Sequence, residues 1–165
     1  MRWFNLILGC VCFMGASPQK SESGTQNGDR TTYYLALQSH DLTKINAALE
    51  LLKTKTGTFT GAFEAALLMK KSGLISNAGE KLELFKQGRT QLEKALAKNG
   101  ENAELHFLRL IVQENAPKIL HYDSNIKEDA SFIGSTFNSQ DSSLRQEILN
   151  YSKTSVALKT TVFHE

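Results

Sequence analysis

Apolar residues between Thr31 and Lys159 recur at helical spacing and do not alternate as they would in strands. The spacing predicts seven helices, over Tyr33–Ser39, Leu42–Lys55, Gly61–Leu74, Glu80–Asn99, Ala103–Asn115, Ile126–Ile133 and Ser142–Tyr151. A last apolar stretch, Val156–Phe163, fits a frayed helix and an extended tail equally well. We therefore expect an all-α fold of antiparallel helical hairpins, with about six to seven helices.

Polar residues that favour helix starts precede most of these stretches. They predict N-caps at Asp41, Thr60, Asn102 and Asp141, and at Asp123, Ser124 or Asn125 for the sixth helix. Gly100 follows the fourth helix and Pro117 follows the fifth, so both are expected to stop the helix before them.

Two helices stand out by their apolar surface. In the fourth, Gly88 interrupts a continuous apolar stripe, at a cost of about 1 kcal/mol in a helix interior. We expect this glycine to let a neighbouring helix approach closely. The fifth, Ala103–Asn115, is apolar around most of its circumference, so it is predicted to be the central and most buried helix.

The first sixteen residues are typical of an export signal. Arg2 precedes an apolar run from Trp3 to Met14, and small residues follow up to Ala16. A retained membrane anchor is the weaker alternative, because a spanning helix needs about 20 apolar residues. The pattern thus favours an exported protein, either periplasmic or associated with the envelope.

Two fates of this signal stay open. The first is cleavage after Ala16, which would remove both cysteines and with them any disulfide or thiolate chemistry. The second is lipidation of Cys10, because Ile7-Leu8-Gly9-Cys10 resembles the lipobox of bacterial lipoproteins. A lipid on Cys10 would be the only membrane attachment that we expect.

The remaining chain divides simply. Residues 17–30 are predicted to be a flexible polar leader, since the stretch PQKSESGTQNGDR contains no side chain suited to a core. Residues 31–159 are expected to form one helical domain, and residues 160–165 a tail. If Cys10 is lipidated, the polar leader becomes the tether between the membrane and the domain.

The composition supports one ordered domain and excludes a strong nucleic-acid footprint. The chain has 165 residues, of which 41% are hydrophobic, enough for a single core. Nineteen Lys and Arg face seventeen Asp and Glu, a net charge of +2, without the clustered basic residues that nucleic acids require.

The sequence between Gly88 and Leu110 resembles the junction of two tetratricopeptide-type helix pairs. Leu92, Ala95 and Leu96 follow the pattern of the second helix of such a pair, and Gly100 stands where that family usually has its turn proline. The aromatic-Leu-Gly-Tyr signature of the first helix is missing, and no second copy follows at about 34 residues. The resemblance therefore implies a degenerate, tetratricopeptide-like bundle of hairpins.

A broader resemblance covers the leader and the segment FLRLIVQENAPKILHYDSNIKED, residues 107–129. Together they look like a group of uncharacterised small bacterial envelope proteins. The resemblance implies an exported helical domain and assigns no activity.

Catalytic and metal-binding patterns are sparse. None of the four histidines has a His or Cys at three or four residues, so no helical metal pair is predicted. His121 and Asp123 are interpreted as a solvated loop pair. Glu101 with Glu104, and Glu128 with Asp129, lie at predicted helix starts, where the helix dipole accounts for acids. We therefore predict no catalytic residue, metal or cofactor.

Arg109 on the most apolar helix is the residue with the clearest demand for a partner, because an unpaired buried guanidinium is costly. The favoured interpretation is structural: Arg109 ties its helix to a carboxylate such as Glu128 or Asp129. The functional alternative is that Arg109, Gln113 and Tyr122 line a groove that binds the carboxylate of a partner.

Two function hypotheses follow. The first is an exported helical module, a scaffold or adaptor, that binds an envelope protein or peptide in a groove between hairpins. The second is a small-ligand carrier or envelope enzyme with a pocket near residues 121–125. An open apolar groove would favour the first, and a closed pocket where Arg109, His121 and Asp123 converge would favour the second.

Overall fold

The protein is described by a computed structural model that covers residues 23–57 and 59–160. The predicted export signal with Cys10, the first residues of the predicted leader and residues 161–165 of the predicted tail lie outside the described residues. The described residues form seven α-helices: α1 Ser23–Gln38, α2 Leu42–Lys53, α3 Thr60–Ser72, α4 Ala78–Lys98, α5 Ala103–Asn115, α6 Ile126–Thr136 and α7 Ser142–Ser152. Three single-turn 3-10 helices accompany them: η1 Lys118–Leu120, η2 Phe137–Ser139 and η3 Leu158–Thr160. The predicted all-α fold is confirmed.

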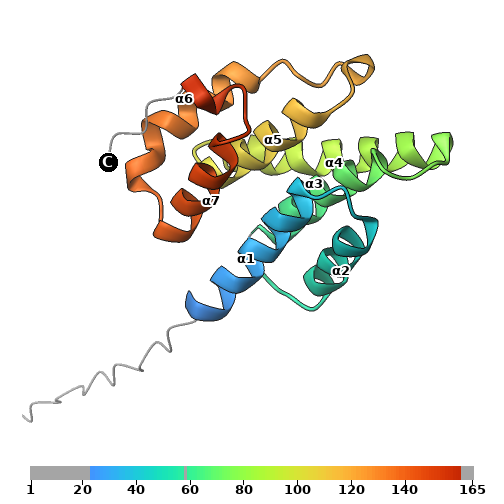
Figure 1. Ribbon diagram of the computed structural model, residues 1–165, viewed down its shortest axis with the longest axis horizontal. Helices are drawn as coiled ribbons and strands as arrows, with labels where there is room; N and C mark the ends of the chain where they lie inside the picture. The colour runs from blue at the N-terminus through green and yellow to red at the C-terminus, as the bar shows by residue number, and fades with distance from the viewer. Residues whose placement is uncertain (1–22, 58, 161–165) are drawn as a thin grey trace, which may run out of the picture.

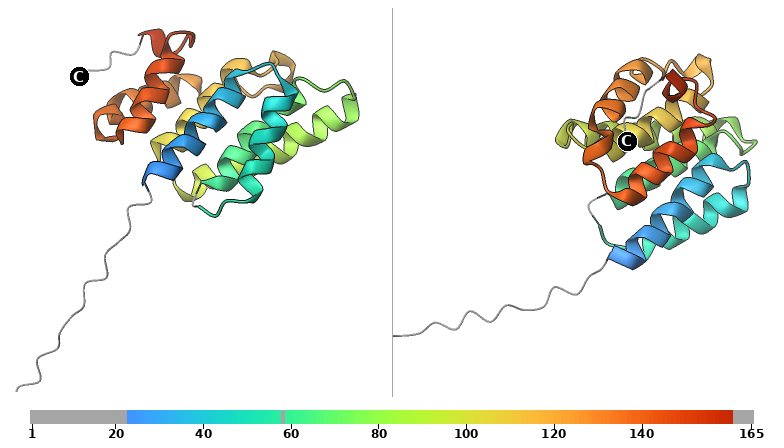
Figure 2. Two further views of the ribbon diagram at one scale, coloured as in Figure 1. Left: turned by 60° about the horizontal axis from the view of Figure 1, so that its bottom comes forward. Right: turned by 60° about the vertical axis from the view of Figure 1, so that its left-hand side comes forward.

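Helix α5 occupies the middle of the molecule, with α1–α4 on one side and α6 and α7 on the other (Figure 1). The two further views agree with this arrangement (Figure 2). From Ala103 to Gln113 every residue of α5 is buried, which confirms that the most apolar helix is the central one. Any residue of α5 that can form hydrogen bonds must therefore find its partners inside the protein.

Consecutive helices from α1 to α6 pack on one another along the chain. The most extensive pair is α3 with α4, which a short connection, residues 73–77, joins into an antiparallel hairpin (Figure 1). Gly88 of α4 lies in their interface. A Cβ there would overlap the carbonyl oxygen of Ala65 and lie 2.7 Å from Met69 Cγ, so the predicted close approach is confirmed.

Three predicted N-caps are confirmed by hydrogen bonds from the first turn of the helix. The side chain of Asp41 accepts from the Thr43 amide, Asn102 from Leu105 and Asp141 from Leu144. The prediction at Thr60 is wrong: Thr60 is the first residue of α3, and Phe59 stands at the cap position without a side-chain bond. For α6, Asn125, one of the three candidates, does stand at the N-cap position. Its side chain forms no capping bond, because its amide pairs with Glu128, Ser124 and Gln113.

Helix α1 begins earlier than predicted. The spacing of apolar residues gave a helix from Tyr33, whereas the structure has one from Ser23, so the flexible leader does not extend to residue 30. Ion pairs account for the turn of α1 just before Tyr33. Arg30 forms ion pairs with Glu104 and Asp141, and Asp29 forms one with Lys55. These partners lie far along the chain, so a pattern of apolar positions cannot predict them.

The end of the domain follows neither alternative for Val156–Phe163. Its described part, residues 156–160, forms a turn followed by η3. Leu158 is buried in the core, while Val156 is exposed. The backbone N–H of Ala157 donates to Glu114 at 2.9 Å, which attaches this segment to the end of α5.

Candidate functional site

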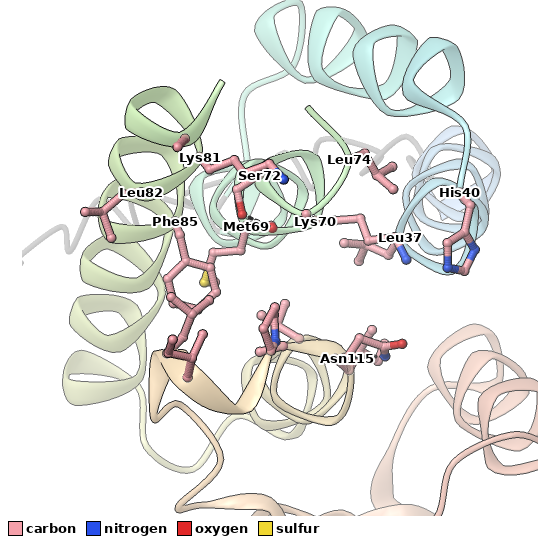
Figure 3. A pocket seen from close by; sticks show the side chains of 18 residues that line it. Leu37, His40, Met69, Lys70, Ser72, Leu74, Lys81, Leu82, Phe85 and Asn115 are labelled. Atoms are coloured by element: carbon pink, nitrogen blue, oxygen red, sulfur yellow. Dashed lines mark hydrogen bonds between the residues drawn. The ribbon is translucent and has the colours of Figure 1, made fainter. Parts of the chain in front are cut away.

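An open groove of about 650 Å³ runs between α1, α3, α4 and the end of α5 (Figure 3). This volume falls within the roughly 300–1,000 Å³ typical of binding sites. Most lining atoms are apolar, as the lining residues indicate: Leu37, His40, Met69, Lys70, Ser72, Gly73, Leu74, Ala78, Lys81, Leu82, Phe85, Ile111, Val112, Asn115, Ala116, Pro117, Ile119 and Leu120. It is the candidate functional site.

The groove has an apolar wall and apolar lips. Met69 of α3 and Phe85 of α4 are buried core residues that present one side to it. Ile119 of η1 is 83% exposed and Leu82 of α4 is 46% exposed, although both are large and apolar. Exposed apolar side chains at the rim of a groove mark a surface that a partner can cover.

Pro117 and His121 shape the lip that carries Ile119. Helix α5 ends at Asn115, and Pro117, which lacks an N–H, precedes the single turn of η1. That turn closes on His121, which adopts the left-handed conformation with φ of 46°. The chain therefore leaves the groove sharply after Leu120, and Ile119 stays on its rim.

Two polar lining side chains form hydrogen bonds to backbone carbonyls of their own helices. The Ser72 hydroxyl donates to the Met69 carbonyl at 2.6 Å, and Asn115 Nδ2 donates to the Ile111 carbonyl at 2.7 Å. Both are local bonds that hold the side chain against its own helix. Asn115 thus caps a carbonyl of α5, and its Nδ2 forms a second bond to the Tyr151 hydroxyl at 3.1 Å.

The charged groups of the groove are all potential cations. Lys70, Lys81 and His40 line it, and no Asp or Glu does. Burial lowers the pKa of Lys70, because its ammonium loses water without gaining an acidic partner among the described residues. Figure 3 shows Lys70 reaching along the groove from α3 toward the side where Leu37 and His40 lie.

Arg109, which the sequence singled out, lies in the core and not in this groove. It is 7% exposed, and its guanidinium donates from Nε and Nη2 to the two carboxylate oxygens of Asp129, at 2.8 and 2.6 Å. A third bond runs from Nη1 to Glu93 at 3.1 Å. The structural interpretation of Arg109, a tie to a carboxylate such as Asp129, is therefore observed.

Tyr122 is brought close to Arg109 through the same Glu93. Its hydroxyl donates to Glu93 Oε1 at 2.6 Å, and its ring packs edge-on against Phe85. Burial, together with the bond to Glu93, raises the pKa of Tyr122 far above its usual range. Arg89 covers the outer face of the ring, 4.8 Å from its centre. Tyr122 thus joins the loop after η1 to α4.

Gln113 does not join this cluster. It is buried on α5, and its amide nitrogen reaches Asn125 at 3.5 Å, a weak contact. Its Oε1 atom has no hydrogen-bond partner among the described residues. The structure therefore brings Arg109 and Tyr122 together on one carboxylate and directs Gln113 elsewhere.

His106 belongs to the Arg109 cluster, a role that the sequence interpretation missed. Its Nδ1 lies 2.7 Å from Asp129 Oδ1, and its Nε2 lies 2.7 Å from the Gly100 carbonyl, while its ring stacks on Phe132. Burial by itself lowers the pKa of His106, but the bonds to Asp129 and to the Gly100 carbonyl outweigh it and raise that pKa. Because both ring nitrogens face acceptors, the geometry favours the doubly protonated cation.

A second charged cluster ties α1 to α5 and α7. Arg30 contacts Glu104 at 2.8 Å and Asp141 at 2.9 Å, and the Tyr34 hydroxyl donates to Glu104 at 3.2 Å. Glu104 is buried, and that burial raises its pKa, which the charge of Arg30 only partly offsets. The helix dipole therefore does not by itself account for Glu104.

A second cavity of about 590 Å³ lies beside α6, close to the loop of residues 121–125. Asp123 and Gln113 are among the residues that line it, but Arg109 and His121 are not. The convergence of Arg109, His121 and Asp123 that would favour an enclosed site is thus not formed. Among the described residues no three His, Cys, Asp or Glu side chains are grouped so that they could hold a metal ion.

Comparisons of the chain with protein-family models, with curated proteins and with solved structures found no match. The resemblances to tetratricopeptide junctions and to small envelope proteins therefore stay predictions. Within the described residues, no helix has both the length and the apolar character needed to cross a membrane.

Proposed function

We propose that this protein is an exported helical module of the bacterial envelope that binds a segment of a partner protein in the groove between α1, α3, α4 and α5. One observation carries the proposal: two large apolar side chains that line the groove are exposed, Ile119 on η1 and Leu82 on α4. A small ligand held inside the groove would leave these lips in water. A protein segment laid across it would cover them.

Packing supports the same function. The groove walls belong to helices that pack in the core. Met69 of α3 and Phe85 of α4 are both buried in it, and α3 and α4 pack extensively on each other. A rigid apolar groove loses little conformational entropy when it binds. Helical hairpins that present such a groove suit a scaffold or adaptor role.

Site-specific photocrosslinking in cells tests the groove. A photoreactive residue replaces Ile119 in one variant and Leu35 in a matched control, because Leu35 of α1 is also exposed and apolar but does not line the groove. We expect one dominant crosslinked protein from position 119 and not from position 35. Leu82→Gln should abolish this crosslink with the thermal midpoint unchanged. Equal crosslinking from both positions, or persistence in Leu82→Gln, would refute the groove.

The N-terminus of the isolated protein tests export separately. Mass spectrometry that finds Ser17 first would support cleavage, and a diacylglyceryl group on Cys10 would support lipidation. A chain that keeps Met1 and fractionates with the cytoplasm would exclude both fates and the envelope assignment with them.

A small-ligand carrier is the second candidate, and the second cavity favours it. The buried Oε1 of Gln113 finds no hydrogen-bond partner in the described part of the chain, and Gln113 lines this cavity together with Asp123. A ligand with a hydrogen-bond donor would satisfy that acceptor. A metabolite that raises the thermal midpoint of the wild type but not of Gln113→Leu would support this candidate, whereas no stabilisation by any metabolite would count against it.

A further inference from the structure

The cations of the groove indicate which partner segment fits it. Each other described cation whose pKa departs from its ordinary value has a raised pKa, because an acceptor outweighs burial. The acceptors are Glu104 and Asp141 for Arg30, Asp129 and Glu93 for Arg109, Asp29 for Lys55, and Asp129 with the Gly100 carbonyl for His106. Lys70 alone among them has a lowered pKa, caused by burial. The groove therefore contains a partly desolvated ammonium that lacks a counter-charge within the described part of the chain.

Apolar and cationic side chains are mixed along the groove. Figure 3 shows Lys81 beside Leu82 on one side and His40 beside Leu37 and Leu74 on the other, with Lys70 extending from α3 between them. The lining residues include no acid that could neutralise Lys70, Lys81 or His40. A complementary occupant therefore carries apolar side chains together with negative charge.

We infer that the groove binds an acidic amphipathic segment of a partner protein, whose apolar side chains pack on Phe85 and Met69 while one of its carboxylates pairs with Lys70. The inference rests on the proposed function and specifies the chemistry of its partner. A carboxylate at Lys70 forms a charge-assisted hydrogen bond in a site that is already partly dehydrated, where such bonds are strong. A fatty acid shares the charge and the apolar tail, but it would leave Leu82 and Ile119 uncovered.

The test uses random dodecapeptides displayed on phage and selected against the protein as isolated from cells. We expect the retained peptides to combine large apolar residues with Asp or Glu. Changing the acid of a retained peptide to its amide, and changing Lys70→Gln in the protein, should each weaken binding about tenfold. The two changes together should weaken it no further than either alone, because they remove the same pair.

Lys71→Gln is the matched control. Lys71 neighbours Lys70 at the end of α3 and carries the same charge near the same helix terminus, but it does not line the groove. Its substitution should leave peptide binding unchanged. Lys70→Gln should keep or raise the thermal midpoint, since it removes a partly buried charge, so that a loss of binding cannot be ascribed to unfolding.

Three outcomes would overturn the inference. Retained peptides without acids, which still compete with the crosslink at position 119, would overturn the acidic partner and leave the groove function standing. Failure to retain any peptide would overturn recognition of a short segment, while the crosslink at position 119 decides the function independently. Binding of dodecanoate that depends on Lys70, with no peptide bound, would replace the partner segment by a fatty acid.

Discussion

The guanidinium of Arg109 donates hydrogen bonds to both carboxylate oxygens of Asp129, with N–O distances of 2.8 and 2.6 Å. This bidentate pair joins the central helix α5 to α6, and the remaining bond from Arg109 to Glu93 adds α4. Asp129 is fully buried. Three helices thus meet at one guanidinium, so its removal should destabilise the whole domain.

Arg109→Ala should lower the free energy of unfolding by about 3–5 kcal/mol, because it removes the bidentate partner of the buried Asp129 carboxylate and leaves it only the His106 imidazole among the described residues. Urea denaturation followed by circular dichroism measures the change. Arg89→Ala is the control: Arg89 only covers the Tyr122 ring from outside, and its loss should cost about 1 kcal/mol or less. If Arg109→Ala keeps its stability and loses the crosslinked partner, Arg109 binds the partner and our structural assignment is wrong.

The stability of the protein should fall as the pH rises through the folded-state pKa of His106. The groups that face its ring set the sign: burial and Arg109 lower the pKa of His106, whereas Asp129 and the Gly100 carbonyl raise it by more. A raised folded pKa means that the stabilisation is complete below the unfolded pKa of about 6.5 and is lost above the folded one.

Urea midpoints measured between about pH 6 and pH 9 test this dependence. The wild type should lose stability across that range, and His106→Gln should have a flatter profile. NMR titration of the imidazole carbons assigns the pKa to His106 directly. A wild-type stability that increases with pH would contradict the cationic state of His106.

Local signals were sufficient to predict much of the fold. The bounds of α5, Ala103–Asn115, are those predicted, because Asn102 caps its start and Pro117 follows its end. The tie between Arg109 and Asp129 was also within reach, since a cation on an apolar helix requires a counter-charge. In these cases the deciding residues lie within a few positions or follow from one residue's cost of burial.

Long-range contacts account for what the sequence did not predict. The partners of Arg30, Glu104 and Asp141, lie 74 and 111 residues further along the sequence. The early start of α1 therefore has no local signal. His106 was set aside because it lacks a ligand at helical spacing, although its position on the most apolar helix already implied buried partners. The groove combines four helices and η1, and no single segment of the sequence contains it.

Arg30→Ala should destabilise the domain by about 2–3 kcal/mol, because Glu104, 4% exposed, keeps only the Tyr34 hydroxyl as a partner. The figure stays below that of a fully buried pair because Arg30 is itself 21% exposed. Adding Glu104→Gln to Arg30→Ala should restore part of the loss, since it removes the stranded charge. Thermal and urea unfolding measure both variants.

The control for Arg30→Ala is a variant of a solvent-exposed ion pair. Lys53 contacts Glu50 at 2.7 Å with both side chains mostly exposed, so Lys53→Ala should cost less than about 1 kcal/mol. If Arg30→Ala costs no more than Lys53→Ala, α1 before Tyr33 contributes nothing to the domain. The flexible leader predicted from composition would then be the better description up to residue 30.

Two glycine-to-alanine substitutions in neighbouring helices should change stability in opposite directions. At Gly88 the new Cβ meets the Ala65 carbonyl and Met69 Cγ, so α3 and α4 must separate, and overpacking of this kind typically costs about 1–3 kcal/mol. The gain in helix propensity, about 1 kcal/mol, opposes this cost but does not remove a backbone clash. At Gly61 of α3 no described atom beyond its chain neighbours and its own helix backbone lies within 4 Å of the new Cβ, so alanine should stabilise by about 0.5–1 kcal/mol. Urea unfolding of both variants separates packing from propensity, and a stabilising Gly88→Ala would mean that the α3–α4 hairpin is looser than the structure describes.

Because Met69 lines the groove from this interface, a true separation of α3 and α4 should also weaken peptide binding by the Gly88→Ala variant and leave peptide binding by the Gly61→Ala variant unchanged.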